Sequence, residues 1–246
     1  MSRKGFDMNI NVHQIKVKVY CLKDIERDSY NAVSSLIDKS FFASDEMCKY
    51  HKRGGYKFYN HGNLGPYSED GFKEGKIYSF YIRTVDNNLV KHFMDNLLEL
   101  QTDELLVMYT SKSIIRKQKF KHIEAITPIQ IKTELGYWRN GFDEEFFYDR
   151  IINNIIKKYN QFNNKNIIEG YFNPFKEIIM RRSYTQRYYK GRLMLGDKCR
   201  FVIDDNKLSQ DLAYFALGVG VGEMNARGFG FLAFHSEDKE EVKKWY

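Results

Sequence analysis

The chain has 246 residues, which is enough for one large domain or two modest ones. Its 39 Lys and Arg outnumber its 32 Asp and Glu, and the formal charge of +7 favours an anionic partner such as nucleic acid. No apolar run reaches the ~18 residues of a membrane span, and three scattered cysteines (Cys21, Cys48 and Cys199) exclude a disulfide framework, so we expect a cytoplasmic protein with reduced thiols and no membrane partner.

The first half of the chain alternates strand and helix patterns. Residues 13–22 alternate apolar and polar side chains and predict a half-buried strand. A helix is expected from Tyr30, and Ser44 caps a short second helix that Gly54 and Gly55 end. The remaining predicted elements are strands at 56–60, 76–85 and 104–110 and a helix at 87–100. The order βαββαβ is that of a ferredoxin-like domain.

The second half repeats this order without an obvious repeat of sequence. An extended apolar run at 123–133 either starts this half or leads into it. The predicted elements are helices at 142–159 and 208–217 and strands at 176–183, 191–203 and 228–234. We therefore expect an α+β fold with two tandem ferredoxin-like (βαββαβ) domains, at residues 1–133 and 134–246, and a C-terminal glycine-rich loop.

Two basic stretches are candidate RNA contacts. Residues 111–122 carry five basic side chains and no acidic one, which fits a solvated sheet edge and an RNA-facing ribbon equally well. Residues 176–200 hold eight basic and two acidic residues with tyrosines among them. Cations can meet phosphates while rings stack on bases, although the tyrosines also fit ordinary strands. The RNA contacts assigned here are Arg181, Arg187 and Lys190.

A glycine-rich segment, LGVGVGEMNARGFGFLAF, occupies residues 217–234. It lies between a predicted helix and a predicted strand, so exposed backbone N–H groups could hold phosphates there. A dinucleotide fingerprint needs the opposite order of strand and helix, and a P-loop needs Lys-Ser/Thr after its glycines, so both are excluded. The alternative is a tight structural turn. The five glycines are Gly218, Gly220, Gly222, Gly228 and Gly230.

One group of side chains could cleave a phosphodiester. The two helices at the start of the chain form an αα-hairpin, which we expect to bring His51 near Tyr30, with Lys57 pointing into the same corner. An imidazole can move a proton, a phenol can orient the phosphate, and an ammonium can stabilise the extra charge of the transition state. An incidental helix-end histidine and a core tyrosine would give the same pattern. None of the six histidines has a partner at metal-ligand spacing, so neither a metal nor another cofactor is expected.

These features together resemble the RAMP superfamily of CRISPR-associated proteins. Within it, the chain resembles the sixth Cas family, the endoribonucleases that cut CRISPR precursor transcripts within each repeat. The matching segments are SYNAV at 29–33, YHKRGGYKFY at 50–59 and GVGVGEMNARGFGF at 218–231. The resemblance implies RNA contacts in the glycine-rich loop, including Asn225 and Arg227 beside the five glycines.

The resemblance also implies catalytic roles. His51 matches the catalytic histidine of the family, Tyr30 a catalytic tyrosine and Lys57 a catalytic lysine. The implied reaction is metal-independent: the ribose 2′-OH attacks the adjacent phosphate and leaves a 2′,3′-cyclic phosphate and a 5′-OH. His61 is either a second catalytic imidazole or a loop residue.

The sequence therefore predicts a metal-independent endoribonuclease that cleaves CRISPR precursor RNA within the repeat to give crRNA. CRISPR repeat RNA is the expected partner, and other CRISPR effector subunits and a second copy of the chain are further candidates. The alternative is a non-catalytic RAMP-type subunit that binds repeat RNA, which would not need the His51 group. A third possibility is a general single-stranded RNA-binding module, which would lose affinity steeply with salt.

Overall fold

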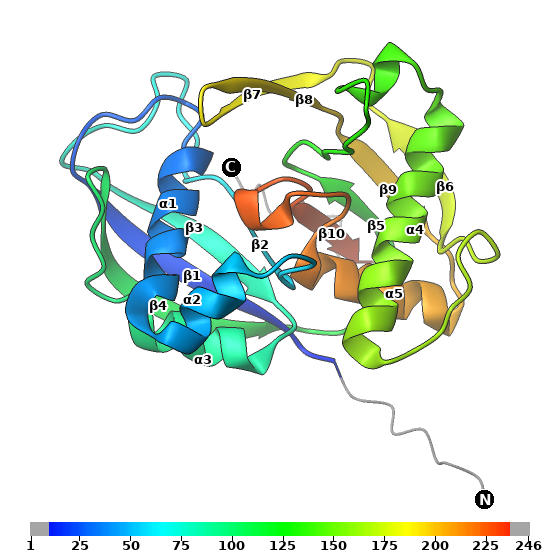
Figure 1. The fold of residues 1–246 in the computed structure, drawn as a ribbon, viewed down its shortest axis with the longest axis horizontal. Coiled ribbons are helices and arrows are strands. Elements are labelled where there is room, and N and C mark those ends of the chain that lie inside the picture. The colour runs from blue at the N-terminus through cyan, green and yellow to red at the C-terminus, as the bar shows by residue number, and fades with distance from the viewer. Residues whose placement is uncertain (1–9, 237–246) are drawn as a thin grey trace, which may run out of the picture.

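The computed structural model describes residues 10–236, which form two halves side by side (Figure 1). The first half contains one four-stranded sheet with the strand order β2-β3-β1-β4, and neighbouring strands are antiparallel. Its elements are β1 (Val12–Cys21), α1 (Tyr30–Ser40), α2 (Asp45–Lys52), β2 (Tyr59–His61), β3 (Ile77–Thr84), α3 (Asn87–Asn96) and β4 (Leu105–Ile115). A single 3₁₀ turn, η1 (Phe41–Ala43), joins α1 to α2.

The second half contains a second four-stranded antiparallel sheet, with the order β10-β5-β9-β6, and a separate hairpin of β7 and β8. Its elements are β5 (Phe120–Ala125), α4 (Glu144–Asn163), β6 (Phe175–Met180), β7 (Thr185–Tyr189), β8 (Arg192–Gly196), β9 (Cys199–Ile203), α5 (Lys207–Val219) and β10 (Leu232–Ser236). The glycine-rich loop between α5 and β10 contains a 3₁₀ turn, η3 (Asn225–Arg227). The predicted mixed fold of helices and sheets is confirmed.

Two predictions about the second half differ from the structure. The strand predicted at 191–203 is two strands, interrupted at Asp197, whose buried carboxylate accepts hydrogen bonds from Tyr137, Trp138 and Arg139. The predicted boundary after residue 133 would leave β5 in the first domain, whereas β5 pairs with β9 and β10 of the second sheet. The second sheet therefore begins before that boundary.

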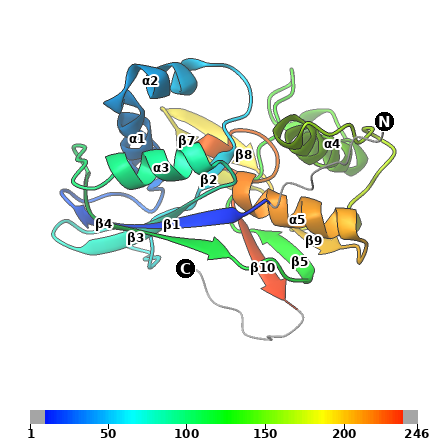
Figure 2. The same cartoon turned by 90° about the horizontal axis from the view of Figure 1, so that it is seen from below.

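The helices lie on one side of the two sheets (Figure 2). In β1, the alternate residues Ile15, Val17 and Val19 are buried and pack in one core with the apolar faces of α1 and α3. A second core lies around α4 and α5, where rings and isoleucines are buried against β5 and β9. The alternating pattern of β1 therefore faces a core on one side, as the sequence predicts.

Helix α5 joins the two halves. The Tyr214 hydroxyl donates to the carbonyl of Ile115 at 2.7 Å and accepts from the amide of Val12 at 3.0 Å. A Cβ at Gly218 would lie 2.6 Å from Cγ1 of Val85, so only glycine lets this turn of α5 approach the first half so closely. Among residues 10–236, no helix combines the length and apolar character that crossing a membrane requires.

Candidate active site

His51 lies in the last turn of α2 and stacks on Phe41, with ring centroids 5.3 Å apart. Helix α2 begins where predicted, because the Ser44 hydroxyl accepts a hydrogen bond from the Met47 amide at 3.3 Å. Acidic residues in its first turn and basic residues in its last turn complement the helix dipole. The His51 side chain remains 18% exposed, so it can reach a bound molecule.

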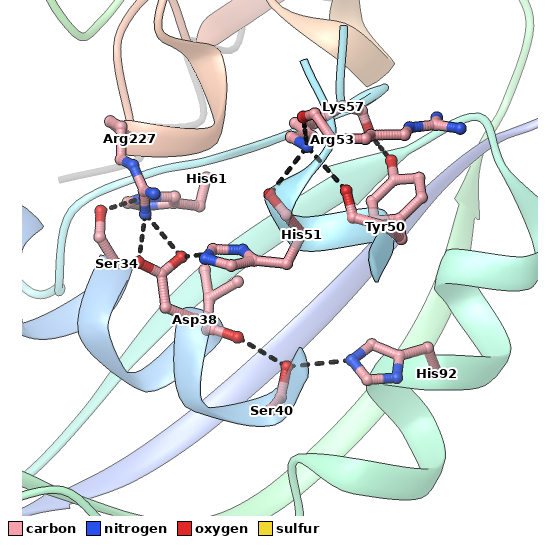
Figure 3. Close-up of polar contacts among 11 residues, drawn as sticks. Ser34, Asp38, Ser40, Tyr50, His51, Arg53, Lys57, His61, His92 and Arg227 are labelled. Atoms are coloured by element: carbon pink, nitrogen blue, oxygen red, sulfur yellow. Dashed lines mark hydrogen bonds and ion pairs between the residues drawn. The ribbon is translucent and has the colours of Figure 1, made fainter. Parts of the chain in front are cut away.

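A carboxylate from α1 and a guanidinium from the glycine-rich loop meet beside this imidazole (Figure 3). Nδ1 of His51 lies 3.7 Å from Oδ1 of Asp38. Both carboxylate oxygens of Asp38 accept hydrogen bonds from Nη1 of Arg227, which belongs to η3. The consecutive helices α1 and α2 and a loop near the other end of the chain thus form one polar cluster. Neither Asp38 nor its role was predicted, because a single acid on a helix carries no signal of its tertiary partner.

The surroundings of His51 keep its imidazole neutral near pH 7. Burial lowers the pKa of His51, the Asp38 carboxylate raises it, and the cations of Arg227, Lys57 and Lys190 lower it further. A neutral imidazole can accept a proton from a hydroxyl and return it later in the reaction.

Two substitutions should move the pKa of His51 in opposite directions. Asp38→Asn removes the attraction to the protonated ring and is expected to lower the pKa, whereas Arg227→Gln removes a repulsion and is expected to raise it. NMR titration of the His51 ring protons measures both shifts. Asp24→Asn, at an exposed carboxylate paired with Lys73, serves as the control. Shifts of the same sign in the two variants would show that Asp38 and Arg227 do not set the charge of His51.

Tyr30 does not lie beside His51. Its ring stacks under the guanidinium of Arg187 at 3.7 Å and lies 6.4 Å from the ring of His61. Tyr30 begins α1 and Asp38 lies two turns further along, a separation of about 12 Å. Helix α2 is too short to bring His51 back to the start of α1. Burial also raises the pKa of Tyr30, so its hydroxyl stays protonated.

Lys57 caps the C-terminal end of α2, next to His51. Its Nζ donates to the carbonyl oxygens of Tyr50 at 2.7 Å, of His51 at 2.9 Å and of Arg53. An ammonium has three hydrogen atoms, so these bonds engage all of them. Burial lowers the pKa of Lys57, and Arg53 and Arg227 lower it further. Lys57 therefore fixes the backbone that carries His51, and its charge lies close to the imidazole.

His61 is fully buried in β2 and is neither a loop residue nor an exposed imidazole. Its Nε2 lies 3.0 Å from Oγ of Ser34, and its Nδ1 lies 2.9 Å from the carbonyl oxygen of Gly62. Gly228 packs over the ring, and a Cβ there would lie 2.8 Å from Cε1 of His61. Burial lowers the pKa of His61 to about 3. The ring serves the packing between β2, α1 and the glycine-rich loop.

The buried neutral His61 should make the protein less stable in acid. The pKa of His61 falls from 6.5 in the unfolded chain to about 3 in the folded protein, so between these two pH values the unfolded chain takes up the proton and the folded protein does not. As the pH is lowered through this range, the free energy of unfolding is therefore expected to decrease by up to about 1.4 kcal/mol per pH unit. Urea unfolding at about pH 7 and about pH 5 should show a smaller difference for His61→Gln than for the wild type. Equal differences would contradict this environment for His61.

A buried lysine of α4 binds the glycine-rich loop through three hydrogen bonds. Nζ of Lys158, on the buried face of α4, donates to the carbonyl oxygens of Gly220 at 3.1 Å and Gly222 at 2.7 Å and to Oδ1 of Asn225 at 2.6 Å. Nδ2 of Asn225 donates to two further carbonyls of the loop, both at 2.9 Å. Burial lowers the pKa of Lys158 to about 7. Lys158 was missed, although a lysine on the apolar stripe of a predicted helix is a visible signal.

The expected phosphate-binding amides of the glycines are mostly engaged within the protein. The N–H groups of Gly220, Gly228 and Gly230 donate to the carbonyls of Ala216, Asn225 and Pro128. All five glycines are buried, and Gly218 lies in the last turn of α5 rather than in the loop. Gly220, Gly222, Gly228 and Gly230 have φ values between 65° and 79°, which favour glycine. The prediction of exposed N–H groups is thus wrong for three glycines, and the loop instead presents the side chain of Arg227.

The basic side chains assigned to RNA lie in three different environments. Arg187 is 2% exposed, is sandwiched between the rings of Tyr30 and Phe229, and donates to the carbonyl of Arg227 at 2.6 Å. Arg181 is exposed and pairs with Glu124 at 2.6 Å. Lys190, at the turn between β7 and β8, is exposed and lies close enough to lower the pKa of His51. The structure therefore places only Lys190 of the three near the imidazole.

Metal ligands do not gather at this site. Within the part of the chain that the structure describes, no three His, Cys, Asp or Glu side chains come together in a way that could hold a metal ion.

Known proteins resemble the chain over most of its length. Residues 110–234 match the family described as CRISPR associated protein Cas6, C-terminal. A curated relative from Methanocaldococcus jannaschii, CRISPR-associated endoribonuclease Cas6 1, is 27% identical over 190 residues, which cover 70% of this chain and 68% of the relative.

Solved structures share the fold. A structure described as CRISPR associated protein Cas6 has a TM-score of 0.69 at 19% identity and covers 92% of this chain and 100% of its own. A Cas6-related protein from Pyrococcus furiosus has a TM-score of 0.66 at 18% identity and covers 92% of this chain and 99% of its own. The family resemblance predicted from the sequence is confirmed: this chain belongs to the Cas6 family of CRISPR repeat-processing proteins.

Proposed function

We propose that the chain is a metal-independent endoribonuclease that cleaves CRISPR precursor RNA within the repeat to give crRNA. The observation that carries this proposal is the partly exposed His51, whose neutral imidazole lies between Asp38 and the cations of Arg227, Lys57 and Lys190. The relative from Methanocaldococcus jannaschii is named an endoribonuclease, which supports the same reaction here.

The proposed reaction is an internal transesterification. The 2′-oxygen of the ribose forms a bond to the adjacent phosphorus, and the bond from phosphorus to the 5′-oxygen breaks. His51 either takes the proton of the 2′-OH or gives one to the leaving 5′-oxygen. Its Nδ1 faces Asp38, so Nε2 is the nitrogen that can meet RNA. The nearby cations stabilise the extra negative charge of the transition state. Tyr30 has no step in this scheme, because it lies two turns of α1 away from Asp38.

We infer that both halves are ferredoxin-like units and that they meet between β4 and β5. The strands of each sheet are counted in chain order, which leaves out the separate β7–β8 hairpin. In both sheets the fourth strand then lies beside the first and the second beside the third, in the orders β4-β1-β3-β2 and β10-β5-β9-β6. RNA would pass over the join, where Arg227 and Lys190 supply charge beside His51. The glycines give the loop its shape and allow Arg227 to cross to the first half.

Cleavage of end-labelled repeat RNA tests this proposal. In EDTA, the protein is expected to cut once within the repeat and to leave a 2′,3′-cyclic phosphate and a 5′-OH. Phosphatase and kinase treatment of the products identifies the ends. Loss of cutting in EDTA that returns with Mg²⁺, or a product with a 5′-phosphate, would contradict the mechanism.

A non-catalytic subunit that binds repeat RNA is the second candidate. Two of the predicted catalytic residues favour it. All three hydrogen atoms of the Lys57 ammonium bind backbone carbonyls, and the Tyr30 ring packs against Arg187 rather than His51. Such a subunit would bind repeat RNA tightly and leave it intact after long incubation, an outcome that the same assay detects.

A further inference from the structure

A cavity of about 530 Å³ opens beside the candidate active site, between the connection from α2 to β2, helix α4 and the glycine-rich loop. Lys57 joins the two places, because it lines the cavity while its Nζ binds the backbone carbonyl of His51 at 2.9 Å. The volume lies within the range of small-molecule sites in proteins. The residues used below, all of which line the cavity, are Tyr56, Lys57, Asn154, Lys157 and Lys158.

The walls of this cavity combine rings with positive charge. Tyr56 is half-buried, and its ring has Nζ of Lys158 5.6 Å from its centroid. Four of the lining side chains are basic, from Lys57, Arg150, Lys157 and Lys158, whereas Glu223 is the acidic one. Lys57 and Lys158 bind oxygens of the protein, and Arg150 pairs with Glu223. Lys157 is exposed and pairs with Glu169 at 3.0 Å, a carboxylate that a phosphate can replace. An aromatic face beside such a cation suits a nucleotide, because the ring can stack on a base while the cation meets phosphate.

An unsatisfied amide group lies in the wall. Oδ1 of Asn154, on the side of α4 that lines the cavity, is buried and has no hydrogen-bond partner. A buried acceptor without a donor costs free energy, so such groups are usually paired. If the amide turns toward the cavity, the exocyclic amino groups and ring N–H groups of nucleobases are donors that can satisfy this oxygen, and an asparagine amide is a common reader of base edges.

We propose that this cavity holds a nucleobase of the RNA substrate close to the scissile phosphate. Tyr56 stacks on the base, Asn154 bonds to its edge, and Lys157 meets the phosphate at the rim. The inference rests on the proposed function, since it places the base of one nucleotide beside the bond to be cut. It assigns to α4, which carries no predicted site residue, a part in choosing where the RNA is cut.

Repeat RNAs in which one nucleotide at a time is abasic test this proposal. Each RNA also carries a 2′-deoxyribose at the cut site, so that equilibrium binding can be measured without cleavage. For the wild type, one abasic position near the cut is expected to weaken binding about tenfold. In Tyr56→Leu and in Asn154→Ala, the same abasic change should have almost no further effect, because the base has already lost its partner.

The control variant is Gln161→Ala, an exposed position of the same helix outside the cavity, which should keep the full abasic effect. Circular dichroism checks the fold, and Asn154→Ala decides the outcome if Tyr56→Leu does not fold. The proposal would be overturned if, at every position, the abasic change weakened binding as much in the two variants as in the wild type. It would also be overturned if the RNA did not bind. Failure of the proposed function has a different signature: all-ribose repeat RNA stays intact, while the abasic effect and its loss in Tyr56→Leu can persist.

Discussion

The His51→Ala protein is expected to cut repeat RNA at least about a hundredfold more slowly than the wild type when all of the RNA is bound by excess protein. The other described histidines near this corner cannot replace it. His61 and His92 are buried, and burial lowers the pKa of His61 to about 3 and of His92 to about 4. Single-turnover rates with excess protein separate the chemical step from binding and product release.

RNA binding by His51→Ala should remain close to that of the wild type, since the imidazole is neutral and partly exposed. Cys48→Ala, on the same helix α2, is the matched control and should cut at the wild-type rate. A His51→Ala protein that cuts nearly as fast as the wild type would remove His51 from the chemistry and leave the binding role as the better explanation.

The second large effect is expected for Lys158→Met, which should lower the free energy of unfolding by about 3 kcal/mol. Methionine fills a similar volume but has no donor. The carbonyls of Gly220 and Gly222 and the amide oxygen of Asn225 would lose the ammonium that holds them. Urea unfolding measures the change.

Lys157→Met is the matched control, because Lys157 is the next residue of α4 but is exposed and paired with Glu169 at the surface. Its effect should stay below about 0.5 kcal/mol. Lys158→Met should also slow cleavage, because the loop that it loosens carries Arg227 to Asp38 and so to His51. Equal stabilities of the two variants would show that the loop does not depend on the buried ammonium.

Local structure could be read from the sequence because local patterns determine it. The alternation in β1 and the cap at Ser44 both appear where residue spacing and side-chain chemistry predict them. The first strand of the second sheet was assigned to the wrong half, because a boundary depends on which strands pair, and pairing is decided at long range.

The candidate site was only partly visible for the same reason. The sequence indicates His51, but its neighbours come from α1 and from a loop near the other end of the chain, as the contacts of Asp38 and Arg227 show. Tyr30 was expected beside it because an αα-hairpin was expected to bring the end of the second helix beside the start of the first, whereas α2 is shorter than α1. The glycine-rich loop was identified, but the partners of its N–H groups were not, because some lie far away in the sequence: the Gly230 amide donates to the carbonyl of Pro128.

The most direct test of the proposed chemistry is single-turnover cleavage, in EDTA, of repeat RNA that lacks one 2′-hydroxyl at the cut site. We predict that the protein binds this RNA as tightly as the all-ribose RNA and makes no cut at that position. Cutting at the same position and at the same rate would contradict attack by the 2′-oxygen, and with it the role given to His51.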